Sequence, residues 1–212
     1  MKTIQLFASA MLITFVMASC SKENTSKPVN TLIDKLVQDV PADPIIGIGT
    51  DGRPFGYNKF TFYSFETNSV VPSTDSASTK WDVAFRGSTI ITNGGASGPG
   101  NGGAFVYQGI FDDLKTISAD STFKLDQSLA ATAVGKSWYV YDAPNNLFIP
   151  TPGRIVVIRT ASGKFAKMEI LNYYKGGVTP AVSAPSDEKL QKQRYYTFRF
   201  AYQSDGTKIF TK

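Results

Sequence analysis

The chain of 212 residues carries 22 basic and 17 acidic side chains, for a formal net charge of +5, and 42% of its residues are hydrophobic. It contains no histidine and a single cysteine, which excludes Ser-His-Asp and Cys-His catalysis, histidine metal sites and an internal disulfide. Because the basic residues are spread along the chain without a basic run, we do not expect a nucleic-acid-binding protein.

The first 19 residues have the features of a secretory signal peptide. Lys2 precedes an apolar core from Ile4 to Val16, which is too short for a stable transmembrane helix. Small residues stand directly before Cys20, as in lipoprotein signals where the cysteine thiol is acylated; the alternative is an ordinary signal peptide with an incidental cysteine. We therefore expect a lipid anchor at Cys20, a polar tether over residues 20–30 and one folded domain over residues 31–212.

Composition and patterning favour an all-β domain. The chain has 15 phenylalanines and 10 tyrosines, and clusters of Gly, Pro, Asn and Asp divide it into short segments. The segment Thr31–Val40 predicts a short helix, although its last residues could equally be a strand. The segment Phe60–Phe65 predicts a strand with aromatic rings on both faces, and a second strand follows in which Trp81, Val83 and Phe85 share one core-facing side.

A glycine-dense loop follows this strand. Six of the residues 94–103 are glycine: Gly94, Gly95, Gly98, Gly100, Gly102 and Gly103. Glycine loses more conformational freedom on folding than any other residue, so we expect the backbone here to approach a ligand or another backbone closely, or to adopt positive φ angles. The GxGxxG spacing does not indicate a dinucleotide site, because Pro99 interrupts it and the strand-like AFVYQGIF follows in place of a helix.

The second half continues in short strands. We expect a strand over Gly103–Phe111, an aromatic strand over Trp138–Tyr141 and then a shaped, proline-rich loop through DAPNNLFIPTPG; residues 111–133 give no clear pattern. The segments Arg154–Thr160 and Lys164–Tyr174 predict a β-hairpin around Ala-Ser-Gly. A polar excursion, an alternating strand over Arg194–Tyr202 and a final edge strand over Thr207–Thr211 complete the chain.

Three stretches of the chain are distinctive: the segment Trp138–Gly177, the closing YYTFRFAYQ from Tyr195, and WDVAFRGSTIITNGGASGPGNGGA from Trp81. Together they resemble the HmuY family, the haem-binding lipoproteins of Bacteroidetes. The resemblance implies mostly antiparallel strands in two packed sheets with at most one or two short helices. It also implies a haemophore-like protein, anchored at the outer membrane or cell surface, that binds haem for iron acquisition and delivers it to a TonB-dependent receptor.

The same resemblance identifies candidate site residues. Members of the family hold haem iron with axial histidines or methionines, and aligning the loop before Pro150 places Asn146 where many relatives have a histidine. Met168 remains as a methionine candidate, although its segment KFAKMEIL suits a packed strand.

Tyrosine and arginine provide the other candidates. Tyrosine can ligate ferric haem as a phenolate, so Tyr141 is the first candidate for iron ligation, followed by Tyr139 and Tyr107. Arg86 and Arg154 are candidates for ion pairs with propionates, because arginine binds carboxylates through two parallel hydrogen bonds. Each of these residues could instead be an ordinary strand residue.

Two alternatives stay open. The scaffold could bind a different ligand, such as another tetrapyrrole, a glycan or a host protein, without ligating haem iron. A hydrolase that uses paired carboxylates is formally compatible with Asp82, Asp112, Asp113 and Asp142, but no spacing singles out a pair, so we do not expect an enzyme.

Overall fold

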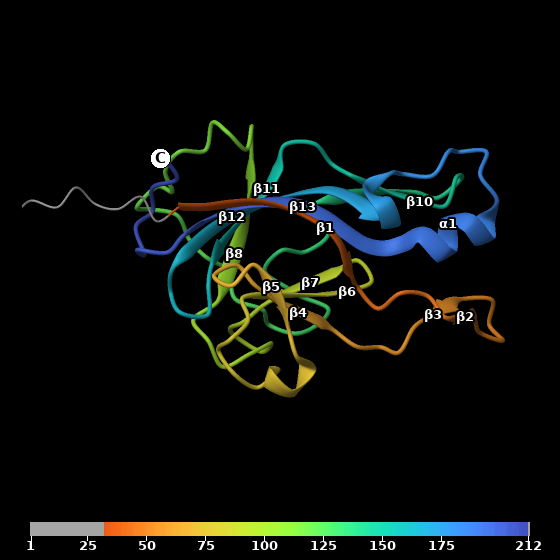
Figure 1. Cartoon of the computed structure of the whole chain (residues 1–212), viewed down its shortest axis with the longest axis horizontal. Coiled ribbons are helices and arrows are strands. Elements are labelled where there is room, and N and C mark those ends of the chain that lie inside the picture. The colour runs from red at the N-terminus through yellow and green to blue at the C-terminus, as the bar shows by residue number, and fades with distance from the viewer. Residues whose placement is uncertain (1–31, 212) are drawn as a thin grey trace, which may run out of the picture.

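The computed structural model describes residues 32–211, which form two packed antiparallel sheets (Figure 1). The five-stranded sheet has the order β1 (Leu32–Pro41), β13 (Gln193–Gln203), β12 (Phe165–Tyr174), β11 (Arg154–Arg159) and β8 (Gly103–Gln108). The four-stranded sheet has the order β5 (Ser69–Val71), β4 (Thr61–Ser64), β6 (Val83–Arg86) and β7 (Thr89–Thr92). The predicted all-β class is confirmed.

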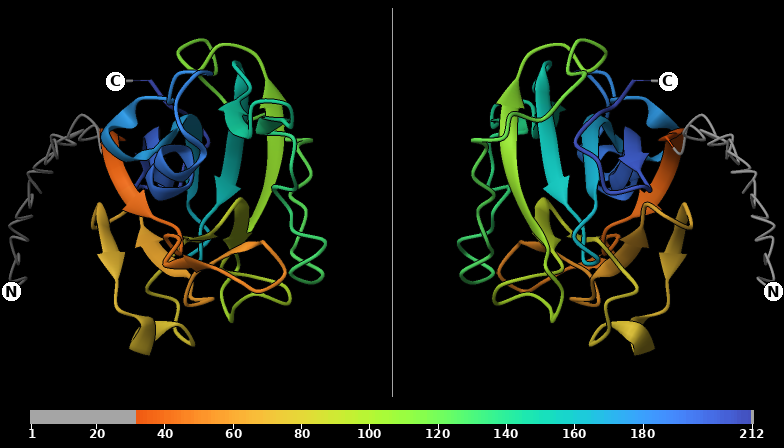
Figure 2. Two further views of the ribbon diagram at one scale, coloured as in Figure 1. Left: turned by 90° about the vertical axis from the view of Figure 1, so that its right-hand side faces the viewer. Right: turned by 90° about the vertical axis from the view of Figure 1, so that its left-hand side faces the viewer.

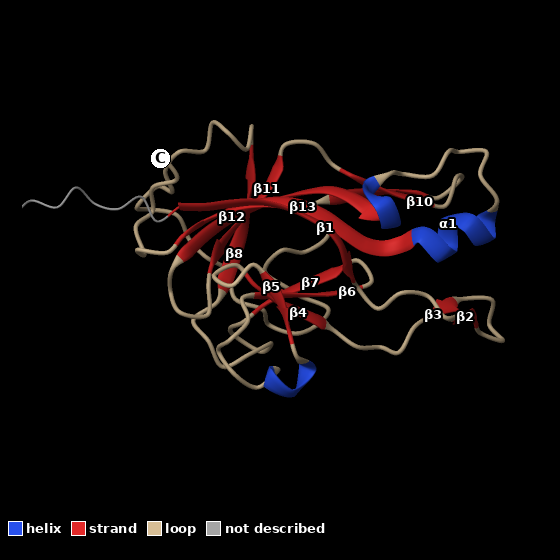
Figure 3. Ribbon diagram, viewed as in Figure 1, coloured by secondary structure: helices blue, strands red, loops and turns tan. Residues whose placement is uncertain are grey.

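Two small hairpins and a few short helical segments complete the fold (Figure 3). The hairpins are β2 (Gly47–Ile48) with β3 (Pro54–Phe55), and β9 (Tyr139–Asp142) with β10 (Leu147–Pro150). Within residues 32–211, α1 (Ser186–Lys192) is the one α-helix, and two 3-10 turns cover Ser73–Asp75 and Lys175–Gly177.

The main core lies between the two sheets, whose strands are seen from two sides in Figure 2. Tyr63 on β4 meets Phe198 of β13 with ring centroids 5.4 Å apart, and Phe85 on β6 meets Tyr196 at 4.7 Å. Burying such a ring stabilises the fold by about 2 to 3 kcal/mol. These aromatic side chains, supplied by alternate positions of both sheets, hold the layers together.

A second core covers the other face of the five-stranded sheet. Ile155 and Val157 of β11 point into it, whereas Val156 and Ile158 point into the main core. Residues 111–117, part of the stretch that shows no clear sequence pattern, contribute Phe111, Leu114 and Ile117 to this second cluster. The sheet is therefore buried on both faces, which explains the unbroken apolar run of β11.

The backbone of the glycine loop packs against the backbone of Asn93, a residue with 0% exposure. The Asn93 amide nitrogen donates to the carbonyls of Ser78 and Trp81 at 2.9 and 2.8 Å, and its oxygen accepts from the Gly100 N–H at 3.0 Å. A Cβ on Gly102 would collide with the backbone of Asn93, and Gly95 has a φ of 59°. The expectation of close approach to another backbone is confirmed, with a positive φ at one position.

Asp82 ties the two sheets together from a largely buried position. Its carboxylate accepts the backbone N–H of Phe65, at the end of β4, at 2.9 Å and that of Ala161, in the turn between β11 and β12, at 3.2 Å. Burial raises the pKa of Asp82 from 3.8 to about 6, while the two N–H groups oppose this shift.

Several predicted strands are confirmed. Strands β4 and β8 lie within the predicted Phe60–Phe65 and Gly103–Phe111, β13 contains the predicted Arg194–Tyr202 and extends it by one residue at each end, and β11 and β12 form the expected hairpin.

The helix predicted for Thr31–Val40 is wrong: apart from Thr31, which lies outside the described residues, the segment is strand β1. Its backbone pairs along β13, and Leu36, which the helix would have used on its apolar face, is 67% exposed. Sheet pairing outweighed the helical periodicity.

Three further predictions were wrong. Trp81 packs with Ala84 and Ile91 on the outer face of the four-stranded sheet, opposite to Val83 and Phe85, because the chain bends at Asp82. Part of the expected loop after Tyr141 pairs with β9 as strand β10. The segment Thr207–Thr211 forms an isolated bridge in place of an edge strand, because Phe210 turns into the second core.

Replacing Gly102 by alanine should destabilise the fold by about 3 kcal/mol, because the new methyl group has no space beside the Asn93 backbone. Gly163→Ala is the control: its φ of 83° is strained for alanine, but nothing lies within 4 Å of the added carbon, so it should cost about 1 kcal/mol. Urea unfolding of both variants tests this, and equal losses would contradict the steric account.

The Asp82 carboxyl should make stability fall as pH rises. Between its unfolded pKa near 3.8 and its folded pKa of about 6, the folded state binds more protons than the unfolded state, so the free energy of unfolding decreases with rising pH. Relative to Asp82→Asn, which does not titrate, the parent should lose about 3 kcal/mol between about pH 4 and about pH 7. Parallel urea-unfolding profiles of the two proteins against pH would disprove this assignment.

Candidate functional site

The two small hairpins and α1 extend beyond the sheets (right side of Figure 1). Residues from these elements line a cleft. It consists of two adjoining hollows of about 480 and about 310 Å³ that share Pro54, Gly87, Ser88 and Arg194. We call this region the hairpin cleft. Its size falls within the range of small-molecule sites.

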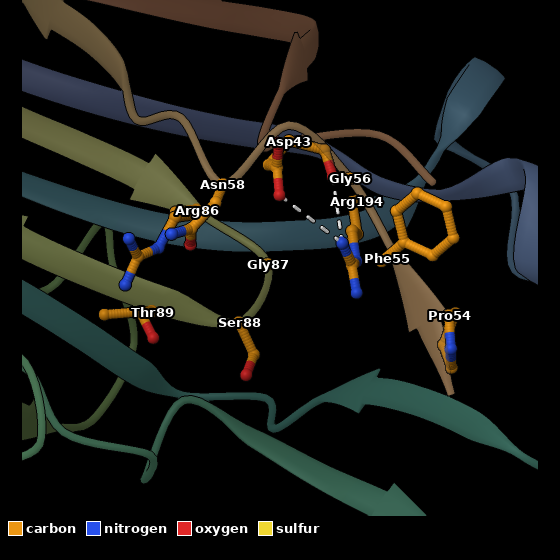
Figure 4. Close-up of a pocket in the computed structure, with 10 residues that line it drawn as sticks. All are labelled: Asp43, Pro54, Phe55, Gly56, Asn58, Arg86, Gly87, Ser88, Thr89 and Arg194. Atoms are coloured by element: carbon orange, nitrogen blue, oxygen red, sulfur yellow. Dashed lines mark hydrogen bonds and ion pairs between the residues drawn. The ribbon is translucent and has the colours of Figure 1, made fainter. Parts of the chain in front are cut away.

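One wall is the arm formed by residues 44–57, which carries β2 and β3. Pro54, Phe55 and Gly56 face the cleft (Figure 4). The arm leaves the body of the protein at Asp43, whose carboxylate lies so close to Gly56 that a Cβ there would collide with it. Phe55 is 47% exposed, so the arm offers an apolar edge to anything that enters the cleft.

The floor is the tight turn between β6 and β7. The Gly87 N–H donates to the Ala42 carbonyl at 2.7 Å, and the Gly87 carbonyl accepts from the hydroxyl of buried Tyr196 at 3.0 Å. Gly87 has a φ of 53°, which favours glycine at this turn. Beside it, the Arg86 guanidinium lies 4.4 Å from the ring centroid of Phe60.

The opposite wall is aromatic and comes from the β9–β10 hairpin and β12. Phe148 is its centre, with ring centroids 5.2 Å from Tyr139, 4.8 Å from Tyr141 and 5.1 Å from Tyr173. The Tyr141 hydroxyl donates to the side-chain oxygen of Asn146 at 2.8 Å, and the Tyr139 hydroxyl donates to Ser88 at 3.3 Å. This wall provides ring faces together with phenol oxygens at the rim.

Helix α1 supports that wall from behind. Buried Lys189 donates to the carbonyls of Asn145 at 3.0 Å and Val182 at 2.6 Å, which fixes the β9–β10 turn next to Asn146. Leu190 lines the cleft. Asp187 and Glu188 lie in the first turn of α1, where the helix dipole favours acidic side chains.

Arg194 is a positively charged residue that lines both hollows of the cleft. One guanidinium nitrogen donates to the Asp43 carbonyl at 3.0 Å and lies 3.7 Å from the Asp43 carboxylate (Figure 4). Burial raises the pKa of the neighbouring Tyr173 hydroxyl, and the charge of Arg194 partly opposes that rise. The cleft thus combines a cation with an aromatic wall.

The structure brings together four of the residues chosen from the sequence. Arg86, Tyr141 and Asn146 line the cleft, and Tyr139 bonds to its floor through Ser88. The others lie elsewhere: Arg154, Tyr107 and the glycine loop do not line the cleft, and Met168 has 0% exposure in the main core. The sulfur of Met168 therefore does not face this cleft.

Sequence reasoning missed Asp43, Phe148, Tyr173 and Arg194. Phe148 lies in the segment interpreted as a loop, and Tyr173 belongs to a hairpin strand that carries no signal of a site. Arg194 was assigned to a strand, and only the fold shows that Asp43, far away in sequence, meets it. The one visible signal was the aromatic density of LNYY, which contains Tyr173, and of WYVY, which overlaps the strand that pairs with the segment of Phe148.

Two further hollows lie outside this cleft. One, of about 350 Å³, adjoins Asp82 and Lys80; the other, of about 340 Å³, adjoins Phe111, Phe210 and the buried Lys167. The Lys167 ammonium donates to the carbonyls of Phe111 and Leu114, which accounts for its position as a support of that turn. Neither hollow contains a candidate binding residue from the sequence.

Three of the four acidic residues considered for hydrolysis have local partners. Asp82 accepts two backbone N–H groups, Asp112 pairs with Arg199 at 3.2 Å, and Asp142 accepts from Asn145. Within residues 32–211, no group of three or more Cys, Asp or Glu is placed to hold a metal ion. No helix in the same range is long and apolar enough to cross a membrane.

Comparison with protein families finds one match: the family described as HmuY protein covers residues 56–183. No curated protein matches the chain.

Solved structures that are similar to this chain have low sequence identity to it. The apo HmuY analogue of Tannerella forsythia has a TM-score of 0.50 at 15% identity, covering 83% of this chain and 98% of its own. A protein of Bacteroides vulgatus, described as HmuY-like and haem-binding, has a TM-score of 0.48 at 13% identity and covers 82% of this chain and 93% of its own. A lipoprotein of Bacteroides fragilis has 0.49 at 12% identity, covering 83% and 93%.

Proposed function

The chain belongs to the HmuY family, and from this membership we propose that its domain binds haem in the hairpin cleft. The observation that carries the proposal is the meeting of Tyr141 and Asn146 at the rim of an aromatic wall. Asn146 stands where the resemblance places a histidine in many relatives, and this position supports the cleft as the ligand site. The chain lacks histidine, and ligation in this protein must therefore be atypical.

The side chains of the cleft fit a tetrapyrrole. Phe148 and its neighbouring tyrosines offer ring faces for stacking, Arg86 and Arg194 offer cations for carboxylates, and the phenol oxygen of Tyr141 offers a ligand for ferric iron. Tyr141 is 47% exposed, so a ligand can reach its oxygen. When bound, haem would bring its iron as the cargo to be delivered.

The described part of the chain begins at the end of β1 that lies away from the cleft. Strand β1 starts at Leu32, opposite Gln203, and ends at Pro41, opposite Tyr195, next to Arg194 of the cleft. Ten residues at about 3.3 Å each separate the two ends by about 30 Å. Cys20, the signal peptide and the tether lie outside the described residues. If Cys20 carries a lipid, the cleft would face away from the membrane and toward a TonB-dependent receptor.

A second candidate is the binding of a tetrapyrrole without a bond to iron. It is favoured by the absence of histidine and by the burial of Met168, which leave tyrosine hydroxyls as the candidate iron ligands among the described residues of the cleft. Stacking on the aromatic wall and ion pairs with arginine need no metal.

Titration of the domain from Ser21 onward with ferric haem should give a saturable, shifted Soret band. Tyr141→Phe, which removes only the phenol oxygen, should abolish the shift, whereas Tyr107→Phe on β8 and Met168→Ala in the core should retain it. Met168→Ala should instead cost about 2 to 4 kcal/mol of stability through the cavity it leaves.

Two outcomes would redirect the proposal. Retention of the shifted band in Tyr141→Phe would rule out phenolate ligation. Absence of a saturable shift in the parent, together with saturable quenching of iron-free protoporphyrin fluorescence, would replace the first candidate with the second.

A further inference from the structure

Arg194 has an unusual backbone conformation at the junction of α1 and β13. Its φ of 71° lies in the left-handed region, which costs a non-glycine residue free energy. Asn, Asp and Gly populate this region most readily. An arginine here therefore indicates that the position is occupied for its guanidinium side chain and not for its backbone preference. The conformation directs the guanidinium between the two hollows, and Arg194 lines both.

The guanidinium is held from one side only. Nη1 donates to the Asp43 carbonyl at 3.0 Å, and the Asp43 carboxylate lies 3.7 Å away, too far for a direct hydrogen bond. Within residues 32–211, Nε and Nη2 make no hydrogen bond. Arginine has five N–H donors arranged to match a carboxylate, so Arg194 keeps unused donors in the cleft.

Asp43 acts as a partial substitute for an external anion. Its Oδ1 accepts the Lys59 N–H at 3.3 Å, and its side chain in the ion pair is only 8% exposed against 18% for Arg194. This carboxylate compensates the charge of Arg194 in the free protein without binding both of its nitrogens. An incoming carboxylate could therefore form the two parallel bonds that Asp43 does not.

The other arginine of the cleft is placed differently. The Arg86 guanidinium lies over the ring of Phe60, 4.4 Å from its centroid, and Figure 4 shows this guanidinium directed away from that of Arg194. Phe148 and Tyr173 lie on the Arg194 side, in the same hollow. A ligand that stacks on the aromatic wall thus brings its charged end toward Arg194.

From this geometry we infer that Arg194 is the main anchor for a carboxylate of the ligand, and that the ligand is an amphipathic acid with a flat apolar body. The inference rests on the proposed function in that it concerns the same cleft. It differs in naming the residue and the ligand group that determine specificity, whatever holds the iron.

The test uses a fluorescent acid that contains no tetrapyrrole, pyrenebutyrate, beside the uncharged pyrenebutanol. The parent should bind the acid more tightly than the alcohol. Arg194→Gln should weaken the binding of the acid by roughly 10- to 100-fold and leave the affinity for the alcohol unchanged. Asp43→Asn, which removes the competing charge but keeps an acceptor for the Lys59 N–H, should strengthen the binding of the acid.

Arg159→Gln is the matched control, because Arg159 lies on β11, donates to the Asn101 carbonyl and does not line the cleft. Thermal unfolding of each variant establishes that it is folded. The opposite effects expected of Arg194→Gln and Asp43→Asn separate an anchor from a mere support, since loss of structure would weaken the acid and the alcohol alike in both variants.

The same variants are then titrated with protoporphyrin IX and its dimethyl ester. A preference of the parent for the diacid that disappears in Arg194→Gln supports the anchor. Equal binding of acid and alcohol, or of diacid and diester, with no effect of Arg194→Gln overturns it and leaves tetrapyrrole binding intact. If no tetrapyrrole binds, the proposed function fails, and the pyrene pair alone supports or overturns the anchor.

Discussion

The side chain of Asn93, buried at the end of β7, holds the part of the fold on which the cleft depends. Its amide joins the carbonyls before β6 to the N–H of Gly100, and the loop of glycines closes around it because no Cβ interferes. Asp82 adds a second buried link at the same end, between β4 and the β11–β12 turn. The β6–β7 hairpin is thereby fixed at its base, so that its opposite end, the turn at Gly87, forms a rigid floor for the cleft.

This arrangement separates stability from binding along the length of the molecule. The glycine loop is the most recognisable stretch of the sequence, yet its close contacts are with its own backbone. Binding chemistry lies at the other end, where the arm of residues 44–57, the β9–β10 hairpin and α1 extend beyond the sheets (Figure 1). These elements have exposed apolar side chains such as Phe55 and Val140 and few long-range strand partners, which is usual for segments that contact ligands.

The sequence predicted the fold class, the central hairpin of β11 and β12, and the strands β4, β8 and β13, because alternating apolar residues and turn signals dominate there. It failed at β1, where the spacing of Leu32, Leu36 and Val40 also suits a helix and only pairing with β13 decides. Of the candidate site, Tyr141 and Asn146 could be predicted from the sequence because they flank one loop. The contact of Arg194 with Asp43 joins residues at opposite ends of the chain, and no local pattern encodes such a meeting. Met168 and Arg154 were chosen for their side-chain chemistry alone, and the fold places both away from the cleft.

Hydrogen–deuterium exchange of the domain with and without ferric haem tests the central claim, that the cleft between the hairpins is the ligand site. The account predicts slower exchange on addition of haem in residues 52–58, 86–89, 141–148 and 190–194, which surround the cleft on all sides. The glycine loop should exchange equally in both samples, because its backbone is already engaged with Asn93. Protection confined to the hollow beside Lys167 or to the glycine loop, or no protection anywhere, would contradict the account.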